Sequence, residues 1–188
     1  ADVVRFVYGF HLAIFLFVSG LQFNDEKYAT APGLLLRNRI ASIWPGYFVY
    51  MTLFTLTSGL FLMAGMLAES YAYQPNVLFR RTVDNFFFRG SETLGGAMWF
   101  VPMMLSGLIV FSLILFLSTK LFGRFRTAST VLLCGLCGFI GLYSCANGYT
   151  YVYYTHVALL LIPLICLGYL VSLYKIRPEK LFRWPVAL

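Results

Sequence analysis

Charged side chains are scarce in this sequence: they make up 11% of its 188 residues, and only 7 residues are acidic. In a soluble domain about a quarter of the residues are charged and about half are apolar. Here the apolar share is 60%, far more than the core of a soluble domain of this length needs. The apolar residues also form blocks of about 20, the length that crosses a bilayer. The composition therefore predicts a polytopic membrane protein.

The hydropathy pattern predicts an all-α fold, a polytopic helix bundle with about five transmembrane helices. We expect residues 1–188 to form a single membrane-embedded helical domain, because the connections leave no room for a soluble one. The predicted spans cover residues 4–23, 45–67, 98–119, 129–146 and 151–174.

The basic residues are distributed unevenly over the connections between these spans. Of the 14 Lys and Arg residues, all but Arg5, Arg80, Arg81 and Arg89 follow the first, third or fifth span. An excess of Lys and Arg marks cytoplasmic loops. We therefore predict an outer N-terminus and a cytoplasmic C-terminus, with membrane lipid rather than nucleic acid as the partner of this charge.

The four cysteines all fall inside predicted spans, and Cys134 and Cys137 form a CxxC pair. This spacing is typical of zinc and redox sites, but no second ligand pair lies nearby. The same segment contains Gly135, Gly138 and Gly141, and small residues at such spacing let membrane helices approach closely. We interpret the segment as a packing surface and predict no metal site.

The first span, GFHLAIFLFVSG, places a histidine in an apolar run. Ionisable groups at membrane depth are costly and usually face protein or a water-filled cavity. At 100° per residue, a sector of about 80° holds every polar residue of this helix core. It contains Tyr8, His11, Phe15, Ser19 and Gln22. We expect this stripe to face the bundle, where His11 is either a neutral hydrogen-bonding imidazole or an acid–base group in a polar chamber.

Two arginines lie in the next segment, PGLLLRNRIASIWPGYF. Its apolar spacing predicts a short amphipathic helix on the cytoplasmic face that ends at Pro45. Arg37 and Arg39 are two residues apart, so they diverge by about 200° on a helix. One would bind lipid phosphate, while the other would turn toward the bundle and bind an anionic ligand. The alternative is that both bind lipid headgroups.

These segments together resemble the acyltransferase-3 family of membrane enzymes, which O-acylate bacterial surface and envelope glycans. The family's second helix reads approximately F-H-M-P-L-F-F-F-I-S-G-Y, and residues 10–20 match it. Residues 37–47 match the family's basic segment that leads to a Pro-aromatic pair, and residues 99–101 match its W-F-L helix opening. The chain thus resembles the middle of a family bundle without its first and last helices. We expect the gene to encode a further N-terminal helix that carries an Arg and then a His.

The resemblance implies a bacterial inner-membrane acyltransferase that transfers groups other than amino-acyl groups. Its donor would be acyl-CoA, most often acetyl-CoA, as a substrate rather than a bound cofactor. The acceptor would be a glycan or lipid-linked sugar hydroxyl, so the implied reaction would be polysaccharide O-acetylation in the cell envelope. The implied roles are a supporting catalytic role for His11 and substrate or donor binding for Arg37, Arg39, Trp99, Tyr8 and Ser19.

Two other classes of function stay open. In a transporter or flippase, the His11 stripe would line a substrate path, although the chain lacks the paired broken helices of such proteins. A non-catalytic scaffold derived from an acyltransferase would keep the bundle without the chemistry. The oligomeric state, a homo-oligomer included, is also open. For Ser19 and Gly20 we favour helix packing over substrate binding.

Overall fold

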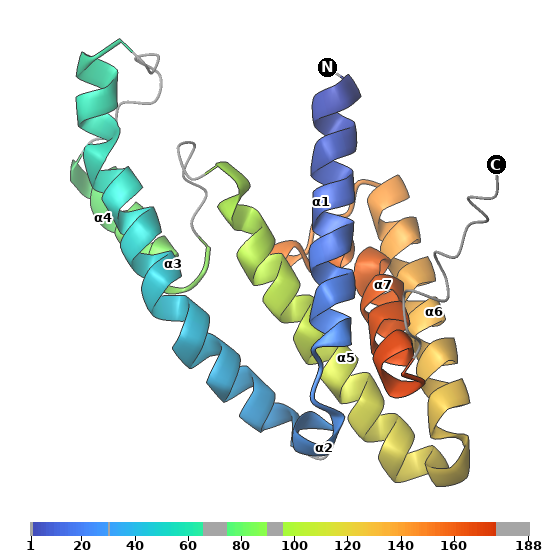
Figure 1. Ribbon diagram of the computed structural model, residues 1–188. Coiled ribbons are helices and arrows are strands. Elements are labelled where there is room, and N and C mark those ends of the chain that lie inside the picture. Colours follow the sequence, from blue (N-terminus) through green and yellow to red (C-terminus); the bar gives the residue numbers. More distant parts are fainter. Residues whose placement is uncertain (1, 30, 66–74, 90–95, 176–188) are drawn as a thin grey trace, which may run out of the picture.

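The computed structural model describes residues 2–29, 31–65, 75–89 and 96–175, and every regular element in these ranges is helical (Figure 1). The predicted all-α fold is therefore confirmed. The elements, with short 3₁₀ turns labelled η, are α1 (Asp2–Leu21), α2 (Asp25–Tyr28), α3 (Pro32–Met63), α4 (Pro75–Phe86), η2 (Gly96–Trp99), α5 (Phe100–Phe122), η3 (Gly123–Phe125), α6 (Arg126–Ala146), η4 (Val152–Tyr154) and α7 (Thr155–Leu173).

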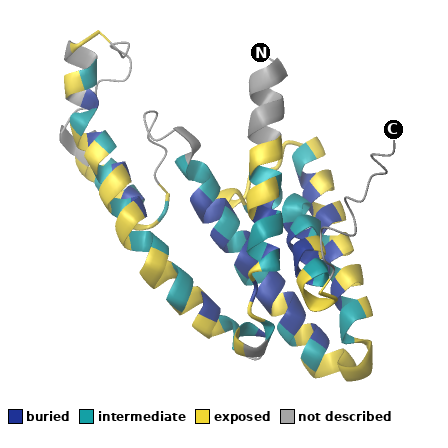
Figure 2. Ribbon diagram, viewed as in Figure 1, coloured by how far each residue is buried: buried dark blue, intermediate teal, exposed yellow. Residues whose placement is uncertain are grey.

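Five long helices, α1, α3, α5, α6 and α7, correspond to the five predicted spans. Among the described residues, three stretches are long and apolar enough to cross a membrane: Pro32–Ser58, Phe100–Ala146 and Val152–Leu173. The second stretch contains both α5 and α6, and Phe10–Leu21 forms a shorter apolar helix. Exposed apolar side chains cover much of α3 and α6 (Figure 2), as lipid contact requires. The chain is a multi-pass membrane protein.

One expectation about the first half of the chain is wrong. The amphipathic segment does not end at Pro45, because α3 begins at Pro32 and continues through Pro45 to Met63. Proline suits the first position of a helix, where its missing N–H would be unpaired anyway. The proline at position 45 removes one backbone hydrogen bond, yet Leu35 before it and Met51 after it are both buried, and this packing holds the helix together. The connection after α3 also contains a helix that we did not predict, α4.

Glycines bring α1, α6 and α7 into backbone contact. A Cβ on Gly20 of α1 would lie 2.1 Å from the carbonyl oxygen of Ile165, and one on Gly168 of α7 would lie 2.0 Å from the backbone of α1. A Cβ on Gly141 of α6 would lie 2.1 Å from the backbone of α7. α7 is therefore clamped between α1 and α6 at distances that only glycine allows. The packing interpretation of the CxxC segment holds for Gly138 and Gly141 but is wrong for Gly135, where a Cβ would meet nothing within 4 Å, and Gly20 is a packing residue as well.

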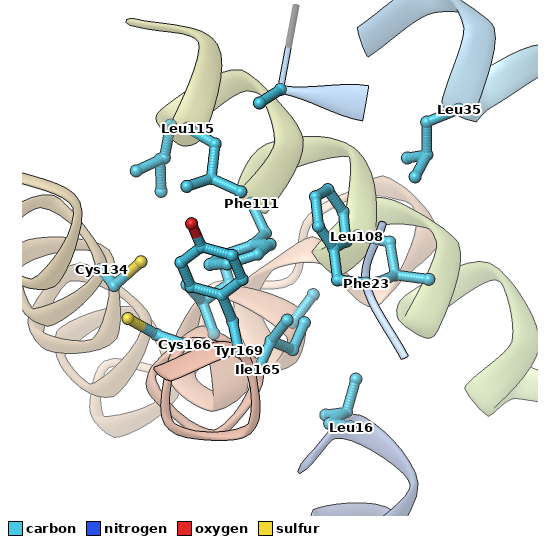
Figure 3. Packing of buried hydrophobic residues seen from close by; sticks show 14 of the residues in the cluster. Leu16, Phe23, Leu35, Leu108, Phe111, Leu115, Cys134, Ile165, Cys166 and Tyr169 are labelled. Atoms are coloured by element: carbon cyan, nitrogen blue, oxygen red, sulfur yellow. The ribbon is translucent and has the colours of Figure 1, made fainter. Parts of the chain in front are cut away.

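The main buried cluster lies where α1, α5, α6 and α7 meet (Figure 3). The Phe111 ring makes edge-to-face contacts with Phe23 at 5.1 Å and Tyr169 at 5.5 Å between ring centroids. At one side of the cluster the thiols of Cys134 and Cys166 face each other from α6 and α7. Both cysteines are buried free thiols that fill the helix interface.

α3 and α4 lean away from this bundle (Figure 1). α4 is attached to α3 by two hydrogen bonds: Trp44 Nε1 donates to the carbonyl of Phe86 at 2.9 Å, and Asn85 Nδ2 donates to Thr55 Oγ1 at 3.0 Å. α3 contacts α5 through a second buried cluster, made of Tyr47, Met51, Val101 and Leu105. α2, the start of α3 and the η3 turn lie at one end of the molecule, which we call the α2 end (Figure 1).

Candidate functional site

A cavity of about 170 Å³ lies between α3, α5 and η4. Most of its wall is apolar, while Ser106 and Tyr153 contribute hydroxyl groups. The Ser106 hydroxyl already donates to the carbonyl of Met103 at 2.8 Å, which leaves its lone pairs to face a ligand. Such a wall suits a short hydrocarbon chain with one or two polar atoms. The lining residues are Leu36, Ile40, Phe88, Pro102, Leu105, Ser106, Ile109 and Tyr153.

Arg37 and Arg39 flank the face of α3 that lines this cavity. At 100° per residue, Arg39 lies about 60° to one side of Leu36, and Arg37 lies about 60° to the other side of Ile40. Arg37 is exposed, whereas Arg39 is half-buried. The Arg39 Nε is buried without a hydrogen-bond partner in the part of the chain that the structure describes. The two arginines diverge as predicted, and Arg39 is the one that lies against the protein.

Arg39 is also close to α2, the short helix before α3. A hydrogen bond from Asn38 lowers the pKa of the Tyr28 phenol, partial burial opposes this shift, and the charges of Lys27 and Arg39 add to the lowering. Lys27 of α2 and Arg39 of α3 thus both act on Tyr28, where α2 meets α3.

Trp99 lies at the start of α5 and packs against η4. Its ring is 5.2 Å from that of Tyr154, whose ring is 6.3 Å from His156. Tyr153 and Tyr154 both have left-handed backbone conformations, with φ values of 57° and 55°. Such residues cost about 1–3 kcal/mol each and cluster at functional sites. The strained turn directs Tyr153 to the cavity and Tyr154 to Trp99.

His156 closes the same strained turn. Its Nδ1 accepts a hydrogen bond from the backbone N–H of Tyr151 at 3.2 Å. The imidazole also lies 6.0 Å from the Tyr151 ring. These contacts give His156 a structural part in the segment that precedes α7.

The stripe on α1 contacts a different face of α5. The Phe15 and Phe100 rings are 5.8 Å apart, and the Ser19 hydroxyl lies 3.9 Å from the Met104 sulfur. At 100° per residue, Phe100 and Met104 lie on roughly the opposite side of α5 from the cavity-lining residues. α5 therefore separates the His11 stripe from the cavity.

The predicted inward orientation of this stripe holds only in part. Ser19 is half-buried, but His11 and Gln22 are exposed, and the Tyr8 side chain lies outside the described residues. The first residue of α5, Phe100, packs against Phe15, and His11 lies one turn before Phe15, beyond the start of α5. Among the ring contacts of the described residues, His11 makes one, with the Phe15 ring at 4.6 Å. Gln22 follows the last residue of α1, so the helical angle no longer applies to it.

Sequence reasoning missed a polar triangle at the α2 end. Arg126 Nη2 donates to Asp25 Oδ1 and, at 3.1 Å, to Tyr169 Oη. The Tyr169 hydroxyl in turn donates to Asp25 Oδ2 at 3.1 Å. The available signal was an acidic residue directly after the first span and a basic residue directly before the fourth, since both lie at the same end of the bundle.

No curated protein and no solved structure matches the chain. A protein-family model described as an acyltransferase domain matches residues 2–188, which include the His11 stripe, the two arginines and Trp99. Membership of that family implies acyltransferase activity, with donor and acceptor left open. This multi-pass membrane protein belongs to the acyltransferase 3 family.

Proposed function

We propose that this protein transfers a short acyl group, in the simplest case acetyl, from acyl-CoA to a hydroxyl of an envelope or surface glycan. The observation that carries the proposal is the apolar cavity with arginines on both sides of its α3 wall. Acyl-CoA combines an apolar acyl end with several phosphates, and guanidinium groups bind phosphates well. A cavity of about 150 Å³ holds one benzene ring. A cavity of about 170 Å³ therefore suits an acyl chain of a few carbons.

We assign donor binding to Arg39, because it is half-buried beside the cavity-lining face, while the exposed Arg37 binds lipid. Trp99 supports the wall through η4, and Ser19 helps to pack α1 on α5. In the reaction, the acceptor oxygen bonds to the acyl carbon, the C–S bond breaks, and the thiolate leaves. A base takes the proton of the acceptor hydroxyl and then gives it to the CoA thiolate, which leaves as the thiol. His11 would support this proton transfer from the acceptor side.

The proposed location is the bacterial inner membrane, with the N-terminus outside and the α2 end in the cytoplasm. The placement of Lys and Arg supports this orientation, because most of these residues lie at the α2 end or in the C-terminal tail. Acyl-CoA is a cytoplasmic metabolite. Arg39, which would bind its phosphates, lies in the first turns of α3 near the α2 end, and the cavity for the acyl group extends from this part of α3 toward the first turns of α5 and η4.

The test uses inside-out membrane vesicles that contain the protein expressed from its complete gene. With labelled acetyl-CoA we expect protein-dependent release of CoA thiol and ester-linked label on glycan. Arg39→Gln should raise the acetyl-CoA KM at least tenfold. Arg37→Gln, the matched loss of charge on the same helix, should change it less than threefold. Absence of protein-dependent CoA release with acyl-CoAs from two to six carbons would refute the proposed donor.

A further inference from the structure

We infer that Asp25, Arg126 and Tyr169 form a latch that positions Arg39 for the donor, an inference that rests on the proposed acyl-CoA reaction. The three side chains come from α2, α6 and α7 and make a closed triangle of hydrogen bonds. The Asp25 and Arg126 side chains are 26% and 28% exposed, and Tyr169 is 3% exposed. A partly buried pair of charges that is also bonded to a third group has a well-defined geometry.

The latch fixes α2 against the tightest part of the bundle. Tyr169 lies on α7 next to Gly168, at the point where α7 touches the backbone of α1. The Phe23 ring, two residues before Asp25, packs edge-on against Tyr169 at 6.3 Å and is buried in the main cluster. The side chain of Asp25 therefore connects a four-residue helix to α6 and α7, two long helices of the bundle.

A second attachment holds the other end of α2. The Ser112 hydroxyl of α5 donates to the backbone carbonyl of Tyr28 at 3.1 Å. Together with the latch, this bond attaches α2 to α5, α6 and α7. α3 begins only a few residues later, at Pro32, so the position of its first turns follows from that of α2.

The connection from α2 to Arg39 is local. Leu35 of α3 is buried in the main cluster, and Tyr28 of α2 packs against the same cluster, so the first turns of α3, which carry Arg39, are held beside α2. Farther along, α3 leans away from the bundle and rests on α5 through a separate cluster (Figure 1). A small shift of α2 would therefore move the first turns of α3, and a displacement of about 1 Å can cost about a hundredfold in catalytic efficiency. Because Arg39 binds the donor in this scheme, the loss should appear in KM. Asp25, Arg126 and Tyr169 are positioning residues in this scheme.

The experiment measures kcat and KM for acetyl-CoA in vesicles that carry the protein expressed from its complete gene. Asp25→Asn and Arg126→Gln should each raise KM at least tenfold and change kcat less than threefold. The double variant should be no worse than the poorer single variant, because both changes break the same unit. Arg124→Gln removes an exposed charge two residues from Arg126 and is the matched control, with less than a twofold change in KM.

Tyr169→Phe keeps the ring in the core and removes only the hydroxyl, so it tests the latch even where loss of a charge prevents accumulation of the protein. It should raise KM about threefold at normal abundance. An unchanged KM in Tyr169→Phe and Asp25→Asn would overturn the inference, as would two single effects that multiply in the double variant. These results leave the acyl-CoA reaction intact. If the wild-type protein releases no CoA, the proposed function fails and the latch's role in donor binding fails with it.

Discussion

The contact between α6 and α7 gives a quantitative prediction for Gly141→Ala. The new Cβ would lie 2.1 Å from the Leu160 backbone nitrogen, whereas ordinary Cβ contacts begin at 3.4 Å. Its neighbours are backbone atoms that cannot rotate away, so the helices must separate by about 1.3 Å. A gap of 0.5–1 Å already loses about a quarter to a half of each dispersion contact. With overpacking costs of about 1–3 kcal/mol, we expect the midpoint of thermal unfolding to fall by roughly 2–12 °C.

The matched control is Gly135→Ala, on the same helix, where a Cβ meets nothing within 4 Å. Replacement of glycine by alanine in an open helix position gains about 0.5–1 kcal/mol, so this variant should be as stable as the wild type or slightly more stable. The assay heats purified protein in detergent and measures the fraction that remains monodisperse by size-exclusion chromatography. Equal midpoints for the two variants, or a more stable Gly141→Ala, would contradict the backbone contact on which the bundle geometry depends.

Three further predictions concern the site and its orientation. In a variant without native cysteines, single cysteines are introduced at the exposed positions Asn24 and Arg124. They should react with an impermeant maleimide only in inside-out vesicles, and labelling in intact cells would show the opposite orientation. Ser106→Phe should fill the cavity and lower kcat/KM for hexanoyl-CoA at least tenfold more than for acetyl-CoA, whereas an equal loss for both donors would show that the acyl chain binds elsewhere. His11→Ala should lower kcat at least tenfold with an unchanged acetyl-CoA KM, because α5 separates His11 from the cavity; a raised KM alone would place His11 in the donor site.

The sequence was sufficient for the fold class because long apolar blocks dominate it and each block becomes a helix. It was less informative about where each helix begins and ends. Pro45 is a strong local signal for a helix end, but burial of Leu35 and Met51 on either side outweighs the single hydrogen bond that the proline removes. Tertiary packing decides such boundaries, and it cannot be read from one segment alone.

The candidate site was predictable in its parts and not in its arrangement. The divergence of Arg37 and Arg39 follows from helix geometry, and the structure shows it. The exposure of His11 depends instead on where α5 begins alongside α1. The angular position of His11 on its own helix gives no information about that. The latch joins residues more than a hundred positions apart, Asp25 and Tyr169, so only the folded chain brings them together.

The start of α5 is where the two separated halves of the site come nearest. Trp99 contacts Tyr154, whose neighbour Tyr153 lines the cavity, and the adjacent Phe100 contacts Phe15 on the stripe of His11. Two consecutive residues thus touch the proposed donor side and the proposed acceptor side of the same helix. In any acyl transfer between these sides, this end of α5 is the short path, because farther along the helix Met103, Leu108 and Phe111 are fully buried in the core. The strained turn before α7 packs against this end through Tyr154, so the strain lies where the donor and the acceptor would meet in the proposed reaction.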